Sequence, residues 1–243
     1  AVHIEQLRRR LVLDAVRVEQ QLDQKMRAAA FASDRDALAL ELRQLLDLMR
    51  AAGVNLVTLF APEHGIAGAV DTNDIADDVD KPTGLPVRSL YGNGRTRVTS
   101  GMFKELDAVV FDIQDVGARF YTYGCAMLYG VEEAAKAGVA FYVLDRPNPI
   151  TGTHVEGPML DANLHSNVGC YDLPVRHGLT LGEMAKMANA EQHWNAKLEV
   201  IRLENPVDRL SAENKLSSPC CFAQAKNRKS TQKNDNHLFY RLY

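Results

Sequence analysis

Short apolar runs of strand length alternate with segments of helical periodicity along the middle of this chain. Continuous apolar runs of this length are typical of strands that are buried on both faces of a parallel sheet. The alternation predicts βαβ units with right-handed crossovers, and therefore an α/β fold with a mainly parallel sheet and flanking helices. The runs cover residues 54–60, 108–111 and 139–144, and the helical patterns cover residues 33–52, 123–136 and 180–191. Residues 198–203 are predicted to form a fourth strand.

Local signals at the ends of these helices support the same assignment. Thr180 and Glu183 have the spacing of a capping box, in which each side chain accepts a hydrogen bond from a backbone N–H at the helix start. Gly138 follows the helical pattern over 123–136 and suits the left-handed position at which many helices end. We therefore expect helix boundaries at these residues.

Composition and charge exclude several classes of protein. Hydrophobic residues make up 46% of the 243 residues and charged residues 24%, values that exclude a wholly disordered chain. The 28 Lys and Arg stand against 31 Asp and Glu, so no basic surplus exists to bind nucleic acid or an anionic membrane. No apolar stretch reaches the roughly 18 residues that a membrane-spanning helix needs. The four cysteines are too few and too unevenly spread for a disulfide scaffold or a zinc finger.

The two ends of the chain differ from its middle. Residues 1–32 carry apolar residues near heptad spacing and predict a helical N-terminal extension, which is a candidate surface for a homo-oligomer. No apolar segment follows the arginines near the start, so no signal peptide is visible. Residues 204–243 predict a basic, irregular tail, with six Lys or Arg against two Asp or Glu after residue 210. Residues 33–203 are then the α/β domain.

Polar and ionisable residues follow each of the first three apolar runs. In an open α/β sheet the ligand binds beyond the carboxyl ends of the strands, so we expect these three clusters to meet around one site. The alternative is that loops are polar in general and that Asp–Arg pairs serve as turn salt bridges. The first cluster is Glu63 and His64, the second is Asp112, Gln114, Asp115 and Arg119, and the third is Asp145, Arg146 and Asn148.

Carboxylates dominate the chemistry that these clusters offer. Two carboxylates in different surroundings can act as general acid and general base, which is the usual equipment of glycoside hydrolases. Arginines bind an anionic group through two parallel hydrogen bonds, and tyrosines pack against sugar rings. The candidate acids are Glu63, Asp112, Asp115, Asp145 and Glu156, the candidate arginines are Arg119, Arg146 and Arg176, and the candidate tyrosines are Tyr121 and Tyr123.

Other chemistries have weaker support. The run 108–111 is followed by an aspartate, as in phosphoaspartyl phosphatases, but Gln114 stands where that motif needs an acidic second residue. The acidic segment 71–80 lacks the glycine and the closing glutamate of an EF-hand loop. No HExxH, GxGxxG, Walker or GxSxG motif is present. The sequence therefore predicts no metal site, no nucleotide cofactor and no Ser-His-Asp triad.

Five sequence blocks stand in a characteristic order between residues 33 and 203. They are LFAPEHGIAG, TGLPVRSLYG, DAVVFDIQDVGARFYTYGCAMLYGVEEAAKAGV, VLDRPNPITGTHVEGPML and LPVRHGLTLGEM. These blocks resemble the exo-β-N-acetylmuramidases, a glycoside hydrolase family formerly known only as a domain of unknown function. The resemblance implies a Rossmann-like α/β domain paired with a smaller C-terminal domain, and an active cleft between them.

The same resemblance implies a substrate and a set of site residues. The enzyme would release N-acetylmuramic acid from the non-reducing end of peptidoglycan fragments, without a metal or organic cofactor, and a periplasmic or extracellular location would suit that substrate. Glu63 would be the acid/base, and His64 would orient it or contact the sugar. Arg176 and His177 are further candidates, and the arginine would meet the lactyl carboxylate that distinguishes muramic acid from N-acetylglucosamine. The subsite would be completed by Asp112, Gln114, Asp115, Arg119, Tyr121, Tyr123, Asp145, Arg146, Asn148 and Glu156.

The chain departs from the family pattern at both ends. The opening strand of the type RVGLITN is not matched in residues 1–32, and the resemblance stops near Glu204, where the family continues into its second domain. We therefore expect the C-terminal second domain to be largely missing. The alternative function is a catalytically inactive homologue that binds carbohydrate or another protein. The sequence leaves open whether a retaining or an inverting mechanism operates, because that depends on a carboxylate separation.

Overall fold

The computed structural model describes residues 35–62, 76–92, 94–150 and 152–202, with side chains from residue 43 onward. The described residues fall into two compact units, one running up to Thr96 and the other from Arg97 onward. The predicted N-terminal extension and basic tail lie outside the described residues. Within the described ranges, no helix combines the length and the hydropathy needed to cross a membrane.

The first unit packs one helix against a small sheet. Strand β3 lies in the centre of the sheet, parallel to β1 and antiparallel to β2. Leu46 from the helix packs with Leu59 and Val87 of the strands in a buried apolar cluster. The predicted strand 54–60 is confirmed only at its end. The elements are α2 (Arg35–Ala51), β1 (Leu59–Ala61), β2 (Asp78–Asp80) and β3 (Leu85–Ser89).

An ion pair ties the helix of the first unit to its sheet. Arg43 on α2 donates two hydrogen bonds to Asp80 at the end of β2, over 2.9 and 3.0 Å. This guanidinium lowers the pKa of Asp80 to about 2, helped by hydrogen bonds from Thr83 and opposed by desolvation. The pair therefore joins elements 37 residues apart.

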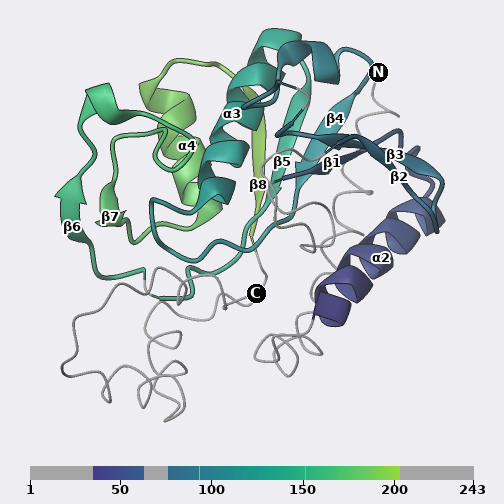
Figure 1. Ribbon diagram of the computed structural model, residues 1–243, viewed down its shortest axis with the longest axis horizontal. Coiled ribbons are helices and arrows are strands. Elements are labelled where there is room, and N and C mark those ends of the chain that lie inside the picture. The colour runs from purple at the N-terminus through teal and green to yellow at the C-terminus, as the bar shows by residue number, and fades with distance from the viewer. Residues whose placement is uncertain (1–34, 63–75, 93, 151, 203–243) are drawn as a thin grey trace. The chain divides into compact units, whose positions relative to one another are not determined.

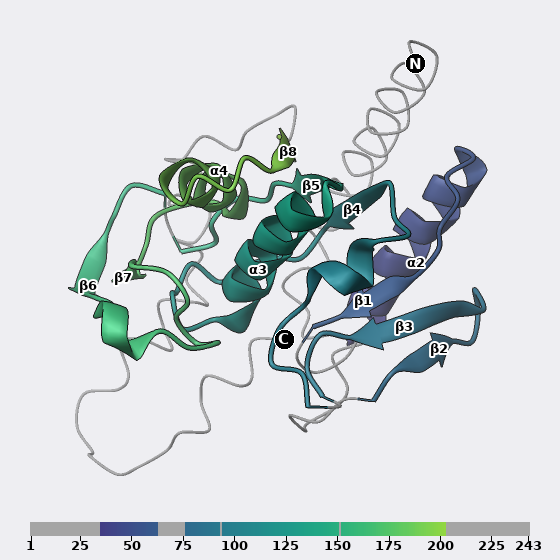
Figure 2. The ribbon, with the colours of Figure 1, turned by 90° about the horizontal axis from the view of Figure 1, so that it is seen from above.

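The second unit contains the parallel sheet that the sequence predicts. Strands β4, β5 and β8 are all parallel, in the order β4-β5-β8, and the helices α3 and α4 connect them in two consecutive βαβ units. Both helices contact β5 and each other, on the same face of the sheet (Figures 1 and 2). The elements are β4 (Ala108–Phe111), α3 (Thr122–Ala137), β5 (Ala140–Leu144), α4 (Leu181–Glu191) and β8 (Lys197–Ile201).

The helix signals in the sequence are confirmed. Gly138 has a φ of 71° and ends α3, donating its N–H to Ala134 and Ala135. Thr180 and Glu183 form both hydrogen bonds of the capping box at the start of α4. One expectation is wrong: β4 is not buried on both faces, because it lies at the edge of its sheet and Val110 is 39% exposed.

An antiparallel ribbon that the sequence analysis did not predict follows β5. It pairs β6 (Glu156–Met159) with β7 (Pro174–Arg176), with an irregular register between Glu156 and Met159. A bridge between Ala118 and Arg176 joins the ribbon to the loop after β4. Two short 3₁₀ helices, η1 (Ser100–Phe103) and η2 (Ala162–Leu164), complete this unit. The ribbon therefore lies against the strand-end loops where the site is expected.

Candidate functional site at the carboxyl ends of β4 and β5

Two of the predicted residues form an ion pair where the neighbouring strands β4 and β5 end. Arg146 donates from Nε and Nη2 to Oδ1 of Asp112, over 2.9 and 2.6 Å. Each side chain is 18% exposed, so the pair faces solvent in part. The parallel register of β4 and β5 brings the loops together, which confirms that the second and third clusters converge.

Gln114 connects the same two loops through backbone groups. Its Nε2 donates to the carbonyl of Asp115 over 2.8 Å and to that of Pro147 over 3.1 Å. The side chain is exposed, but its amide nitrogen is occupied by these two bonds. Gln114 therefore fixes the distance between the loops.

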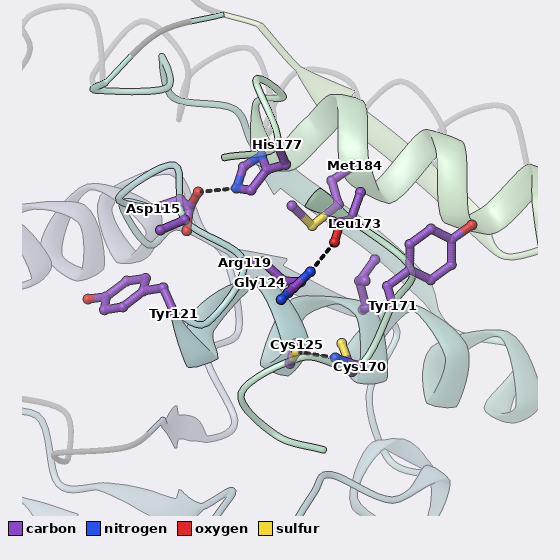
Figure 3. A pocket seen from close by; sticks show the side chains of 12 residues that line it. Asp115, Arg119, Tyr121, Gly124, Cys125, Cys170, Tyr171, Leu173, His177 and Met184 are labelled. Carbon is purple, nitrogen blue, oxygen red and sulfur yellow. Dashed lines mark hydrogen bonds and ion pairs between the residues drawn. The ribbon is translucent and has the colours of Figure 1, made fainter. Parts of the chain in front are cut away.

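Asp115 and His177 form a buried pair (Figure 3). His177 Nε2 lies 3.2 Å from Asp115 Oδ2, and the side chains are 1% and 6% exposed. The N–H of Leu179 donates to His177 Nδ1 over 3.2 Å, so Nδ1 acts as an acceptor and Nε2 is the ring atom that faces the carboxylate. Gly117 N–H donates to the same carboxylate oxygen over 2.9 Å. The pair therefore joins the loop after β4 to the segment after β7.

Asn148, in the loop after β5, packs against Gly117 in the loop after β4 and bonds to the segment after β7. Its Nδ2 donates to the carbonyl of Leu179 over 2.9 Å, and its Oδ1 accepts from Ile150 N–H over 3.1 Å. Gly117 has a φ of 79°, and a Cβ there would lie 2.3 Å from Asn148 Oδ1. This position therefore needs glycine both for its backbone conformation and for space.

The arginines predicted to bind an anion are engaged within the protein. Arg119 donates from Nη1 to the carbonyls of Pro158, over 2.9 Å, and Leu173. Arg176 donates to Glu156 and, over 2.9 Å, to the carbonyl of Ile150. The Arg176 guanidinium lowers the pKa of Glu156. These contacts hold the β6–β7 ribbon, and the predicted contact with a lactyl carboxylate stays a prediction.

Asp145 is buried beneath the start of α4. Its carboxylate accepts from Gly182 N–H over 2.8 Å and from the Thr180 hydroxyl over 2.9 Å. A Cβ on Gly182 would lie 2.6 Å from Asp145 Cγ, so glycine allows this approach. Desolvation raises the pKa of Asp145 despite both bonds. Both hydrogen bonds anchor the start of α4, and the predicted contact of Asp145 with substrate stays a prediction.

A small pocket lies beside the Asp115–His177 pair (Figure 3). Tyr121 lines it and packs edge-on against the buried Tyr123, with ring centroids 4.7 Å apart. The sequence analysis missed the other polar and sulfur-containing residues of the lining, because they come from α3, α4 and the loop before β7 without a common motif. The missed residues are Cys125, Cys170, Tyr171 and Met184.

Comparison with known proteins identifies the family. Residues 30–215 match the sequence model described as "Exo-beta-N-acetylmuramidase NamZ, N-terminal". The chain belongs to the NamZ family. The peptidoglycan beta-N-acetylmuramidase NamZ of Bacillus subtilis (strain 168) is 45% identical over 153 residues, which cover 63% of this chain and 37% of that protein.

Two solved structures of DUF1343 family proteins from Bacteroides fragilis NCTC 9343 are similar to this NamZ-family chain. One is 44% identical with a TM-score of 0.56 and covers 64% of this chain and 39% of its own. The other is 34% identical with a TM-score of 0.53 and covers 68% of this chain and 46% of its own. The chain therefore spans less than half the length of these relatives.

The remaining site predictions of this NamZ-family chain lie outside the described residues. Glu63 and His64 belong to that group, so their predicted catalytic roles stay predictions. Among the residues that the structure describes, no group of three or more His, Cys, Asp or Glu side chains is arranged to hold a metal ion. The described part of the site thus consists of two linked strand-end loops, a buried Asp–His pair and an adjoining ribbon.

Proposed function

We propose that this chain is the α/β part of a glycoside hydrolase that removes N-acetylmuramic acid from the non-reducing end of peptidoglycan fragments. The observation that carries the proposal is the 45% identity, over 153 residues, to the peptidoglycan beta-N-acetylmuramidase of Bacillus subtilis. The family match over residues 30–215 supports it, since that range contains every predicted site residue.

In the proposed reaction Glu63 donates a proton to the glycosidic oxygen as the bond breaks. A general acid of this kind is needed because a sugar alkoxide is a poor leaving group. His64, next in the chain, orients Glu63 or contacts the sugar. The anomeric configuration of the released sugar, measured by ¹H NMR, distinguishes two mechanisms. Retention indicates that a second carboxylate acts as nucleophile, and inversion indicates that it activates water.

In this proposal Asp112 binds sugar hydroxyls. Both hydrogen bonds from Arg146 end on Oδ1, so Oδ2 receives no hydrogen bond from the residues that the structure describes. The partial exposure of this carboxylate at the ends of two parallel strands supports the role, because ligands bind beyond strand ends in α/β sheets. A carboxylate held in this way accepts hydrogen bonds from vicinal hydroxyls while Arg146 fixes its orientation.

Asp115 and His177 act in this proposal as positioning residues. The His177 ring is buried with Nε2 3.2 Å from the carboxylate of Asp115, which accepts a hydrogen bond from Gly117 N–H. The pair therefore holds the segment that carries Asp112 and Gln114 in one conformation.

The test is product analysis with the purified chain. A disaccharide of N-acetylmuramic acid β-linked to N-acetylglucosamine is incubated with the chain, and mass spectrometry detects free N-acetylmuramic acid. The matched control is N,N′-diacetylchitobiose, which lacks only the lactyl group. We expect cleavage of the first sugar and at least about tenfold slower cleavage of the second, the size of a lost charge-assisted contact. Equal rates on both, or binding of the muramic disaccharide without any cleavage by the folded chain, would contradict the proposal.

A further inference from the structure

Two cysteines from distant parts of the second unit meet in the wall of the pocket. Cys125 is the fourth residue of α3, and Cys170 lies in the loop before β7, 45 residues later. The backbone N–H of Cys170 donates to Cys125 Sγ over 3.1 Å (Figure 3). Both are free thiols; Cys125 is buried and Cys170 is partly exposed.

The surroundings of the pair lower the pKa of the Cys125 thiol. The thiol of Cys170 and the backbone N–H groups of Cys170 and Gly169 donate hydrogen bonds that lower the pKa of Cys125, against the effect of burial. The start of α3 adds the positive end of the helix dipole. The pKa of the Cys170 thiol is raised, mainly because it donates to Cys125. Two free thiols thus lie beside each other, with the backbone N–H of Cys170 on the sulfur of Cys125, and neighbouring thiols are what disulfide formation requires.

We propose that Cys125 and Cys170 are a thiol-oxidation site, at which a small disulfide such as oxidised glutathione converts the two thiols into a reversible disulfide bond. One cysteine sulfur, as its thiolate, attacks oxidised glutathione, forming a mixed disulfide and releasing one reduced glutathione. The other cysteine sulfur then attacks the first and expels the second glutathione. In sum, each cysteine loses one proton and one electron, and the two electrons reduce one oxidised glutathione to two thiols.

The disulfide links α3 to the loop before β7 across a long segment of chain. The closed loop contains the β6 strand, and the residues just beyond Cys170 include Tyr171 and Leu173, which line the pocket. Closing so long a loop removes conformational freedom from the unfolded chain, so oxidation is expected to raise thermal stability. This inference does not depend on the proposed glycosidase activity.

The test uses the full chain, which is first incubated with oxidised glutathione. The chain is then denatured in the presence of N-ethylmaleimide, which blocks free thiols, and digested with trypsin without reduction. Cleavage after Arg119, Lys136 and Arg176 places the cysteines on separate peptides, 120–136 and 137–176. We expect these two peptides joined, two hydrogen atoms lighter than their sum. The melting temperature should rise by about 5–10 °C and return on reduction.

Matched variants separate this pair from the other cysteines. Cys170→Ser changes the more exposed member and should abolish both the cross-link and the temperature shift. The double variant Cys220→Ser, Cys221→Ser should retain both. Peptides 120–136 and 137–176 that are both alkylated, that carry only glutathione, or that are joined to the peptide containing Cys220 would each overturn the proposal.

Discussion

At the residue scale, Asp80 and Asp145 differ in the groups that offset the desolvation of their carboxylates. Asp80 is compensated by a full guanidinium, and its pKa falls to about 2. Asp145 is compensated by a hydroxyl and a backbone N–H, and desolvation raises its pKa. Charge–charge compensation therefore stabilises the ionised form of the first, whereas dipoles alone do not offset desolvation of the second.

Replacing Arg43 tests the first of these environments. A carboxylate whose pKa is lowered on folding stabilises the fold above its unfolded pKa near 4, and this stability is lost as the pH falls towards 2. Arg43→Met should lower the free energy of unfolding by about 1–2 kcal/mol at pH 7 and flatten the loss between pH 4 and pH 2. Urea unfolding across this range measures both effects. Arg50→Met is the control, because Arg50 donates to the Thr83 carbonyl, which does not titrate; the same flattening in that variant would contradict the assignment.

Replacing Asp145 tests the second carboxylate environment, in which a hydroxyl and a backbone N–H are the hydrogen-bond donors. Asp145→Ala leaves the Gly182 N–H and the Thr180 hydroxyl without their acceptor and should cost about 2 kcal/mol of unfolding free energy. Asp145→Asn keeps one acceptor oxygen and should cost less. Because the pKa is raised on folding, the stability of the wild type relative to Asp145→Asn should fall as the pH rises from below 4 through the raised pKa. A difference that instead grows with pH in urea unfolding would show that Asp145 is stabilised as an anion.

At the element scale, helix α3 depends on a glycine where it crosses β5. A Cβ on Gly130 would lie 2.9 Å from the ring of Phe141, which is buried. On Gly124 of the same helix, the nearest atom to a Cβ would be Met184 Sδ, at an ordinary 3.5 Å. The two glycines have the same intrinsic helix propensity, so their alanine variants differ only in the space available for the added methyl group.

The two alanine variants should change stability in opposite directions. Gly130→Ala gains helix propensity but overpacks the core, and we expect a net loss of about 1–2 kcal/mol. Gly124→Ala should gain about 0.5 kcal/mol. Thermal or urea unfolding of both variants measures the difference. A stabilised Gly130→Ala would mean that the helix is free to move away from the sheet.

Elements whose signals are local could be predicted from the sequence, and elements that depend on distant partners could not. The apolar run 108–111, the Gly138 cap and the capping box at Thr180 are all local, and all are confirmed. The β6–β7 ribbon was missed because β6 is exposed throughout and contains a proline, so its sequence carries no strand pattern. Its pairing is set by contacts with β7 instead.

The same distinction applies to the site. The approach of Asp112 to Arg146 followed from parallel strands ending side by side. Hydrogen bonding of Asp145 to the start of α4 could not be predicted, because it depends on a backbone approach that only Gly182 permits. The contact between Cys125 and Cys170 joins segments with no shared motif, and no local pattern announces it.

At the scale of the whole molecule, the described residues give two α/β units with separate cores. The family match extends through both, from residue 30 to residue 215. The chain spans 37% of the length of its Bacillus subtilis relative, so the activity of that whole protein is a proposal for this one. The proposal depends most on Glu63, because the reaction needs a proton donor.

The most direct measurement is the hydrolysis of a chromogenic aryl β-N-acetylmuramide by three purified forms of the chain. Glu63→Gln keeps the size and polarity of the side chain and removes the transferable proton. Glu105→Gln changes an exposed glutamate outside the proposed site and serves as the control. We predict hydrolysis by the wild type and by Glu105→Gln at equal rates, and a rate about 10²–10⁴-fold lower for Glu63→Gln. Equal hydrolysis by all three forms, or no hydrolysis by the folded wild type, would contradict the account.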